Sequence, residues 1–159
     1  VGIAALVDEA TGFQAVRAKD ALAQILEAFV QKELRKWVRT FPAEYYKELC
    51  RLRGVSYPPP NMKLPQYFGG LTNNIVYERL APGVKDELKR VTPRDASGRH
   101  KNKLFQRLTD DIGNPKLREH LASVVALMTI APDYDTFIKF LDRVAPRWDD
   151  TLPLALGDS

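Results

Sequence analysis

The sequence lacks the short motifs that identify the common catalytic classes. It contains no glycine-rich phosphate loop, no HExxH zinc motif, no CxxC pair and no GxSxG nucleophile elbow. Only two histidines are present, His100 and His120, so a catalytic cysteine or a metal site has few possible partners. The balance favours a protein that is not an enzyme, and we expect no cofactor.

Cysteine is almost absent as well. The single Cys50 excludes an internal disulfide, and it stands at a helical position that suits a small buried side chain. We therefore expect an inert, buried thiol. Because free thiols are typical of a reducing compartment, we also expect a cytoplasmic protein.

Long apolar runs are missing, so no membrane-spanning helix and no membrane partner are predicted. The apolar start at residues 1–7 is short, lacks a basic flank and meets Asp8 and Glu9 at once, which argues against a signal peptide. The sequence has no initiator Met and begins within a helical pattern. We expect it to be the C-terminal part of a longer protein.

What the sequence does contain is helical periodicity over a length of 159 residues, which suits one compact domain. No alternation of polar and apolar residues lasts long enough for a strand, and no internal repeat is visible. We predict a single all-α domain over residues 1–159. It would be an irregular helical bundle of about six to seven helices with a Pro-rich extended strap at residues 54–70.

The longest helical pattern covers residues 13–38, where no Gly or Pro interrupts it. Apolar side chains recur there at steps of three and four residues and continue into the following break, at Leu22, Ile25, Leu26, Phe29, Val30, Leu34, Trp37 and Phe41. Such a stripe predicts either the central packing helix or a face that forms a homo-oligomer.

Shorter helices are predicted on both sides of the strap. Breakers and caps place them at residues 1–12, 43–53, 72–80, 84–91, 104–108, 114–130 and after Asp133. The strap itself is expected to be anchored by Tyr57, Met62, Leu64, Tyr67 and Phe68. Residues 92–103 are polar, contain Gly and Pro, and predict an exposed loop.

Positive charge is concentrated at residues 85–107. This segment has eight Lys and Arg residues and three carboxylates, a net charge of +5, whereas the whole chain carries +4. Long cationic side chains on a loop can reach phosphates without fixed geometry, so DNA is a possible partner. The alternative is a merely solvated cationic loop. The candidate phosphate-binding residues are Arg94, Arg99, His100, Lys101, Lys103 and Arg107.

Two adjacent carboxylates, Asp110 and Asp111, follow this basic segment. With His120 they are candidate ligands of a divalent metal, although the two aspartates precede a predicted helix and His120 lies inside it. The alternative is a structural turn, in which Asn114 caps the helix, Pro115 is its first residue, and the aspartates lie near its positive end. The residue pattern favours the structural turn.

Four blocks of the sequence together resemble a known family. They are residues 1–14, residues 33–42 with Glu33-Leu34-Arg35-Lys36-Trp37 and Thr40-Phe41-Pro42, residues 74–84, and residues 108–121. In this order they are similar to the P-sixty-three-C domain of phage-derived bacterial proteins. The sequence departs from the family at Asn114 and around Leu104-Phe105, where the family has histidine more often. Both changes remove histidines near Asp110 and Asp111.

The resemblance implies a phage or prophage context, in which such domains follow regions that look like antirepressors. It supplies no established activity. Three functions therefore stay open: a regulatory module that self-associates and supports DNA binding, a metal-dependent nuclease or hydrolase using Asp110, Asp111 and His120, and a protein-interaction domain. The concentrated charge favours the first of them.

Overall fold

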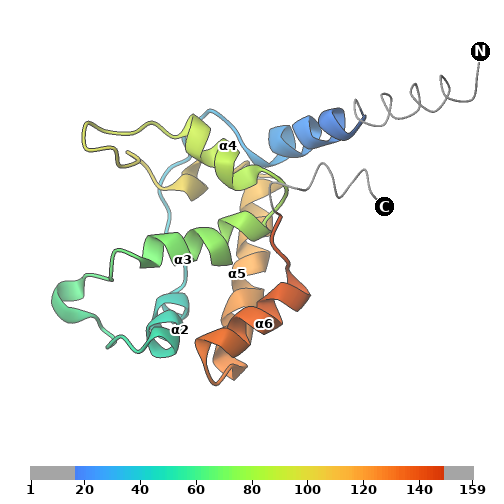
Figure 1. Ribbon diagram of the computed structural model, residues 1–159. Coiled ribbons are helices and arrows are strands. Elements are labelled where there is room, and N and C mark those ends of the chain that lie inside the picture. The colour runs from blue at the N-terminus through green and yellow to red at the C-terminus, as the bar shows by residue number, and fades with distance from the viewer. Residues whose placement is uncertain (1–16, 149–159) are drawn as a thin grey trace, which may run out of the picture.

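A computed structural model describes residues 17–148 as an all-α fold built around one central helix (Figure 1). This helix, α5 (Gly113–Ile130), contacts α2 (Ala43–Arg53) and α6 (Tyr134–Val144). Its fully buried positions recur at steps of three and four residues, at Leu117, Leu121, Val124 and Met128. The all-α fold class predicted from the sequence is confirmed, and so is the helix that ends at Ile130.

The remaining elements are arranged around the upper part and the left of α5 in Figure 1. They are a helix at residues 17–29, α3 (Phe68–Ile75), α4 (Val84–Val91) and three short 3-10 helices, η1 (Pro60–Met62), η2 (Tyr77–Arg79) and η3 (Leu104–Arg107). Within residues 17–148 no helix is long and apolar enough to cross a membrane. The predicted helix at residues 1–12 lies outside the described residues.

The predicted long helix at residues 13–38 is wrong in its second half. The chain is helical from residue 17 to residue 29 and then extended as far as residue 41, and residues 13–16 are not described. The backbone N–H groups of Gln31 and Arg35 donate to the carbonyl oxygens of Arg107 and Gln106, both at 2.9 Å. Because tertiary partners satisfy these groups, the segment does not need helical hydrogen bonds. It is α5, and not this helix, that occupies the centre.

The 30–41 segment is held at its start by contacts with the loop before α5. Thr109 donates from its backbone N–H to the Phe29 carbonyl oxygen at 2.9 Å and from its hydroxyl to the Ala28 carbonyl oxygen at 2.6 Å. Gly113 lies where the end of the 17–29 helix crosses the start of α5. A Cβ at Gly113 would overlap the Phe29 carbonyl oxygen and lie 3.0 Å from the Leu108 Cβ. Glycine is therefore required where the two backbones pass.

We predict that Gly113→Ala lowers the free energy of unfolding, by about 1–3 kcal/mol, because the added methyl must displace backbone. Gly70→Ala in α3 is the control, since a Cβ there meets nothing within 4 Å. That control should be neutral or stabilise by about 0.5–1 kcal/mol through helix propensity. Urea denaturation of both variants measures the difference, and equal stability of the two would contradict the crossing.

The start of α5 also differs from the prediction. Gly113 is its first residue and Ile112 the preceding one, so Asn114 is not the cap. The cap-like contacts come from Thr109, whose hydroxyl accepts from the Gly113 N–H and whose carbonyl accepts from the Asn114 N–H, both at 2.8 Å. The Asn114 side chain instead accepts from Arg118 Nε at 3.0 Å. The helix begins early because Thr109 is already fixed by its bonds to residues 28 and 29.

The Pro-rich strap is shorter than predicted. α3 begins at Phe68 and includes both Gly69 and Gly70, so the helix predicted at residues 72–80 starts earlier and ends at Ile75. Of the expected anchors, Phe68 is buried and Leu64 packs against the core. The other three, Tyr57, Met62 and Tyr67, are exposed. Leu64 is therefore the one expected anchor that lies within the shortened strap and packs against the core, since Phe68 belongs to α3.

Other predicted boundaries are confirmed. α2 ends at Gly54, which takes φ +70°. The Asp133 carboxylate caps α6 by accepting from the Thr136 N–H at 2.8 Å. Cys50 is fully buried in α2, and this burial raises the pKa of its thiol, as expected for an inert side chain.

A buried arginine connects η2 to the C-terminal end of α6. The Arg79 side chain is 1% exposed and forms a salt bridge of 2.7 Å with Asp142 on α6. It also donates to the carbonyl oxygens of Asn74 and Ala145, each at 3.0 Å. A buried guanidinium is stable only where its donors are satisfied, so these contacts fix η2 against the end of α6.

Candidate nucleic-acid interface

The predicted loop at residues 92–103 is an ordered hairpin. Arg94 and His100 face each other in an antiparallel bridge, and the Lys101 N–H donates to the Pro93 carbonyl oxygen at 2.8 Å. The Asp95 N–H donates to the Arg99 carbonyl oxygen at 2.7 Å. Gly98 takes φ +85° at the tip, a conformation that favours glycine. The loop is exposed, as predicted, and we call it the basic hairpin.

Asp95, the carboxylate of the basic hairpin, is used internally. Its Oδ1 accepts from the Ser97 hydroxyl at 2.6 Å, from the Ser97 N–H at 2.9 Å and from the Arg99 N–H at 3.1 Å. The Ser97 hydroxyl is the main reason that the pKa of Asp95 lies below its ordinary value, and the Arg99 N–H adds to the effect. Asp95 thus forms hydrogen bonds within the turn and no salt bridge with a cation among residues 17–148.

We predict that Asp95→Ala loosens the hairpin without unfolding the domain. Amide hydrogen exchange should accelerate at Ser97 and Arg99, while exchange in α5 stays unchanged. Ser97→Ala removes only the hydroxyl and is the milder control. In the wild type the same loosening should appear as pH falls through the lowered pKa of Asp95, because protonation removes the charged acceptor. Equal exchange in all three proteins would show that Asp95 does not organise the turn.

The structure brings four of the six candidate phosphate-binding residues together on the hairpin, with Lys103 at its end and Arg107 further away in η3. Arg94 donates to the Gly98 carbonyl oxygen at 2.6 Å, and Arg107 donates to the Lys32 carbonyl oxygen. These two side chains thus have structural partners. Arg99 and Lys101 are exposed and form no side-chain hydrogen bond or salt bridge with residues 17–148.

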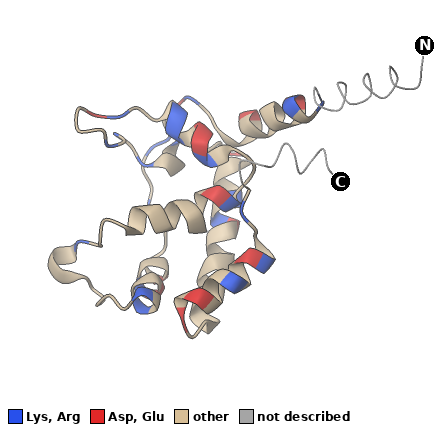
Figure 2. Cartoon of the chain, in the orientation of Figure 1, with Lys and Arg blue, Asp and Glu red and all other residues tan. Residues whose placement is uncertain are grey.

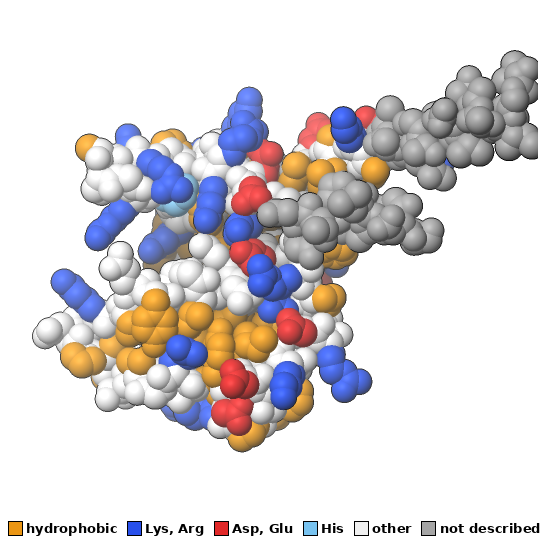
Figure 3. Space-filling view, in the orientation of Figure 1, with side chains coloured by type: hydrophobic (Ala, Val, Ile, Leu, Met, Phe, Trp, Pro, Cys, Tyr) orange, Lys and Arg blue, Asp and Glu red, His pale blue; other side chains and the backbone are white. Residues whose placement is uncertain are grey.

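Charge is unevenly distributed over the visible face. Figure 3 shows Lys and Arg side chains gathered at the upper left, where Figure 1 places the basic hairpin. Asp and Glu side chains lie further to the right, over α4 and α6, where they alternate with cations (Figure 2). α3, next to the hairpin in the picture, has no charged residue. The hairpin side is therefore the positive side of this face.

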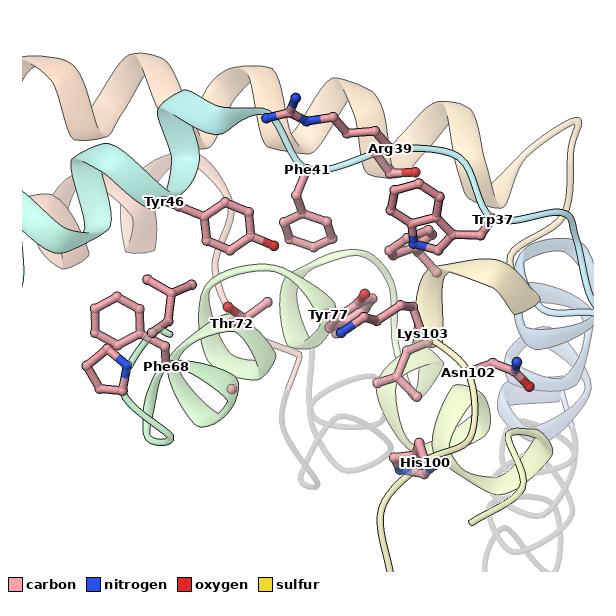
Figure 4. Close-up of a pocket in the computed structure, with 16 residues that line it drawn as sticks. Trp37, Arg39, Phe41, Tyr46, Phe68, Thr72, Tyr77, His100, Asn102 and Lys103 are labelled. Carbon is pink, nitrogen blue, oxygen red and sulfur yellow. The ribbon is translucent and has the colours of Figure 1, made fainter. Parts of the chain in front are cut away.

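A cavity of about 770 Å³ opens beside the hairpin (Figure 4). One wall is the end of the 30–41 segment with Tyr46 of α2, and the other is formed by α3, Tyr77 and the chain from His100 to Phe105. Six aromatic side chains line it: Trp37, Phe41, Tyr46, Phe68, Tyr77 and Phe105. Its volume lies in the range of about 300–1,000 Å³ that is typical of ligand sites.

The charged side chains that line this cavity are of one sign. They are Arg39 and Lys103, and none of the described residues that line it is Asp or Glu. In Figure 4 Lys103 extends into the cavity from the hairpin side. Trp37 lies at the rim with 56% of its surface exposed. The arrangement combines an aromatic interior with a cationic edge.

Sequence reasoning missed this cavity because it placed Trp37 in a helical stripe. An extended segment brings Trp37 and Arg39 opposite residues more than sixty positions away, and periodicity contains no information about that pairing. One available signal was the break at Thr40-Phe41-Pro42, which stops a helix close to Trp37.

The three candidate metal ligands are not gathered. The Asp110 carboxylate pairs with Arg35, Asp111 is exposed, and His120 Nε2 donates to the Ile75 carbonyl oxygen at 2.8 Å. Within residues 17–148 no group of three or more His, Cys, Asp or Glu residues could hold a metal ion. Here the structural turn, and not the metal site, describes the geometry.

Burial lowers the pKa of His120 below 6.5, and the nearby charge of Arg79 lowers it further, against the hydrogen bond to Ile75. The folded state therefore binds fewer protons than the unfolded state once the pH approaches the ordinary histidine value. Stability should consequently fall as pH decreases through 6.5.

We predict that His120→Gln flattens this dependence, since glutamine can still donate to Ile75 but does not titrate. Chemical denaturation at pH 7.5 and 5.5, on the order of one unit either side of the ordinary histidine pKa, measures the slope. His100→Gln is the control, because it keeps His120 and should keep its contribution. An unchanged slope in His120→Gln would exclude His120 as its source.

Comparison with known families assigns the chain. The model of the P-sixty-three-C domain matches residues 25–117. The chain belongs to the P-sixty-three-C domain family. No curated protein and no solved structure matches it. The match includes the whole basic hairpin and every residue that lines the cavity, whereas most of α5 and all of α6 follow it.

Proposed function

We propose that this P-sixty-three-C domain is a non-enzymatic regulatory module that supports DNA binding through the basic hairpin. Its context would be phage-derived, as the family resemblance implies. The observation that carries the proposal is the pair Arg99 and Lys101, whose side chains are exposed and form no hydrogen bond or salt bridge within residues 17–148, on a hairpin whose Asp95 carboxylate is hydrogen-bonded to the turn.

The geometry suits contact with the DNA backbone. Flexible cations that neutralise phosphates release counterions, and this supplies affinity independent of base sequence. A hairpin that is ordered by its own hydrogen bonds presents these cations without a folding cost at the moment of binding. We do not assign base readout to it, since no element with a row of side chains suited to base edges is described at the hairpin.

We also propose self-association, through a smaller apolar surface than the helix at residues 13–38 that the sequence predicts. The predicted interface was a helix at residues 13–38, but within the described residues the helix ends at residue 29. Ile25, Leu26 and Phe29 of that helix pack against the chain's own core. The exposed apolar side chains after it are Leu34, Trp37 and Val38. Solution mass as a function of concentration tests whether copies associate.

The DNA proposal predicts that Arg99→Gln with Lys101→Gln weakens binding to a blunt duplex about ten-fold or more at low salt. It should also reduce the slope of log K against log salt by about 2, one contact for each residue. Lys139→Gln with Arg143→Gln is the matched control, since it removes the same charge from exposed positions on α6. Fluorescence anisotropy over a salt series measures both quantities.

Equal losses in the two double variants would reduce the effect to net charge and reject the hairpin as the contact. If the wild type shows no salt-sensitive duplex binding, DNA binding by this domain is rejected, and a protein-interaction role becomes the better account.

A further inference from the structure

The aromatic cavity is not used by the proposed phosphate contacts, although it adjoins them. Lys103 belongs both to the chain that leaves the basic hairpin and to the lining of the cavity. A strand whose phosphates lie along the hairpin would therefore pass the cavity, because His100 of the hairpin and Lys103 at its end both line it. The question is which chemical group the cavity would accept from such a strand.

The lining favours a flat, apolar group attached to an anion. Trp37 is a large aromatic side chain at the rim with 56% of its surface exposed, so much of the indole is open to a ligand. Phe41 and Phe105 lie deeper, with ring centroids 6.0 Å apart. Every nucleobase presents a face that stacks on such rings, and single-strand binding proteins combine aromatic platforms with cationic grooves.

His100 adds a specific polar feature. Its Nδ1 lies 3.1 Å from the Thr92 carbonyl oxygen, which can only accept, so Nδ1 carries the proton of the neutral ring. Its Nε2 is then an acceptor, and it is buried without a partner among the described residues. His100 lines the cavity.

We propose that this cavity binds an unpaired nucleotide, with its base against Trp37 and its phosphate near Lys103. The inference rests on the proposed function, because it places a single-stranded end beside a duplex held by the basic hairpin. Such a domain would prefer a duplex with an unpaired tail, or an opened duplex, over a blunt one. An acidic peptide with aromatic side chains is the competing occupant. Continuity with the hairpin cations favours the nucleotide.

The test compares a blunt duplex with the same duplex carrying a short thymidine tail. In the wild type the tail should raise affinity about ten-fold, the order expected for one base stacked on an aromatic side chain. Trp37→Ala should remove this gain and leave blunt-duplex affinity unchanged. Ile130→Ala, which truncates an exposed apolar side chain on α5, is the control and should keep the gain.

A spectroscopic measurement places the base directly. The sequence has two tryptophans, so Trp148→Phe leaves Trp37 as the only one. Binding of the tailed duplex to this variant should quench the Trp37 fluorescence, and the blunt duplex should not. Removal of the tail by an exonuclease should restore the signal.

The outcomes separate the two proposals. If the blunt duplex binds with the predicted salt dependence but the tail adds nothing, or the gain survives in Trp37→Ala, the cavity assignment is overturned while the hairpin proposal stands. If a peptide of alternating Glu and Phe quenches Trp37 and displaces the tail at lower concentration than free oligothymidylate does, the occupant is a peptide and the assignment is overturned. If Trp37→Ala loses the affinity gained from the tail and keeps its affinity for the blunt duplex, the result supports the cavity assignment.

Discussion

The pairing of the 30–41 segment with η3 is the interaction on which the described site depends. Two backbone hydrogen bonds from Gln31 and Arg35 and one from the Gln106 side chain to the Arg35 carbonyl oxygen hold an extended chain against a short 3-10 helix. Without these bonds the apolar pattern of that segment would favour a helix, and Trp37 would belong to the apolar stripe of that helix. With them, Trp37 and Arg39 face the chain that leaves the basic hairpin. The cavity forms because tertiary hydrogen bonds override the helical preference of the 30–41 segment.

Helices whose ends carry strong local signals could be predicted from the sequence. α2 stands between Pro42 and Gly54, α6 follows the Asp133 cap, and α5 ends at the break before Pro132. Their buried faces are those that periodicity indicated. The errors fall where a distant segment decides the conformation. Residues 30–38 became extended, and the first residue of α5 moved to Gly113 because Thr109 was already tied to the 17–29 helix.

Only the part of the candidate site that is contiguous in the sequence could be predicted. Residues 92–103 are contiguous, so the concentration of charge was visible in the sequence and the structure places it on one exposed hairpin. What could not be predicted was the separation of roles inside that set. Arg94 and Arg107 donate to the carbonyl oxygens of Gly98 and Lys32, so two of the counted cations have partners within the fold. The aromatic cavity needs two chain segments far apart in sequence, and neither segment alone indicates it.

The contacts of Arg79 show that the boundary of the family match is not the boundary of a folding unit. Arg79 lies inside the matched residues 25–117, but its carboxylate partner Asp142 and its acceptor Ala145 lie beyond them. The last three buried positions of α5 lie beyond them too. A chain cut at residue 117 would leave a guanidinium without its counter-ion and an apolar core without its central helix. The basic hairpin and the cavity are therefore grouped in one part of the sequence, while part of the core that holds them in place comes from another.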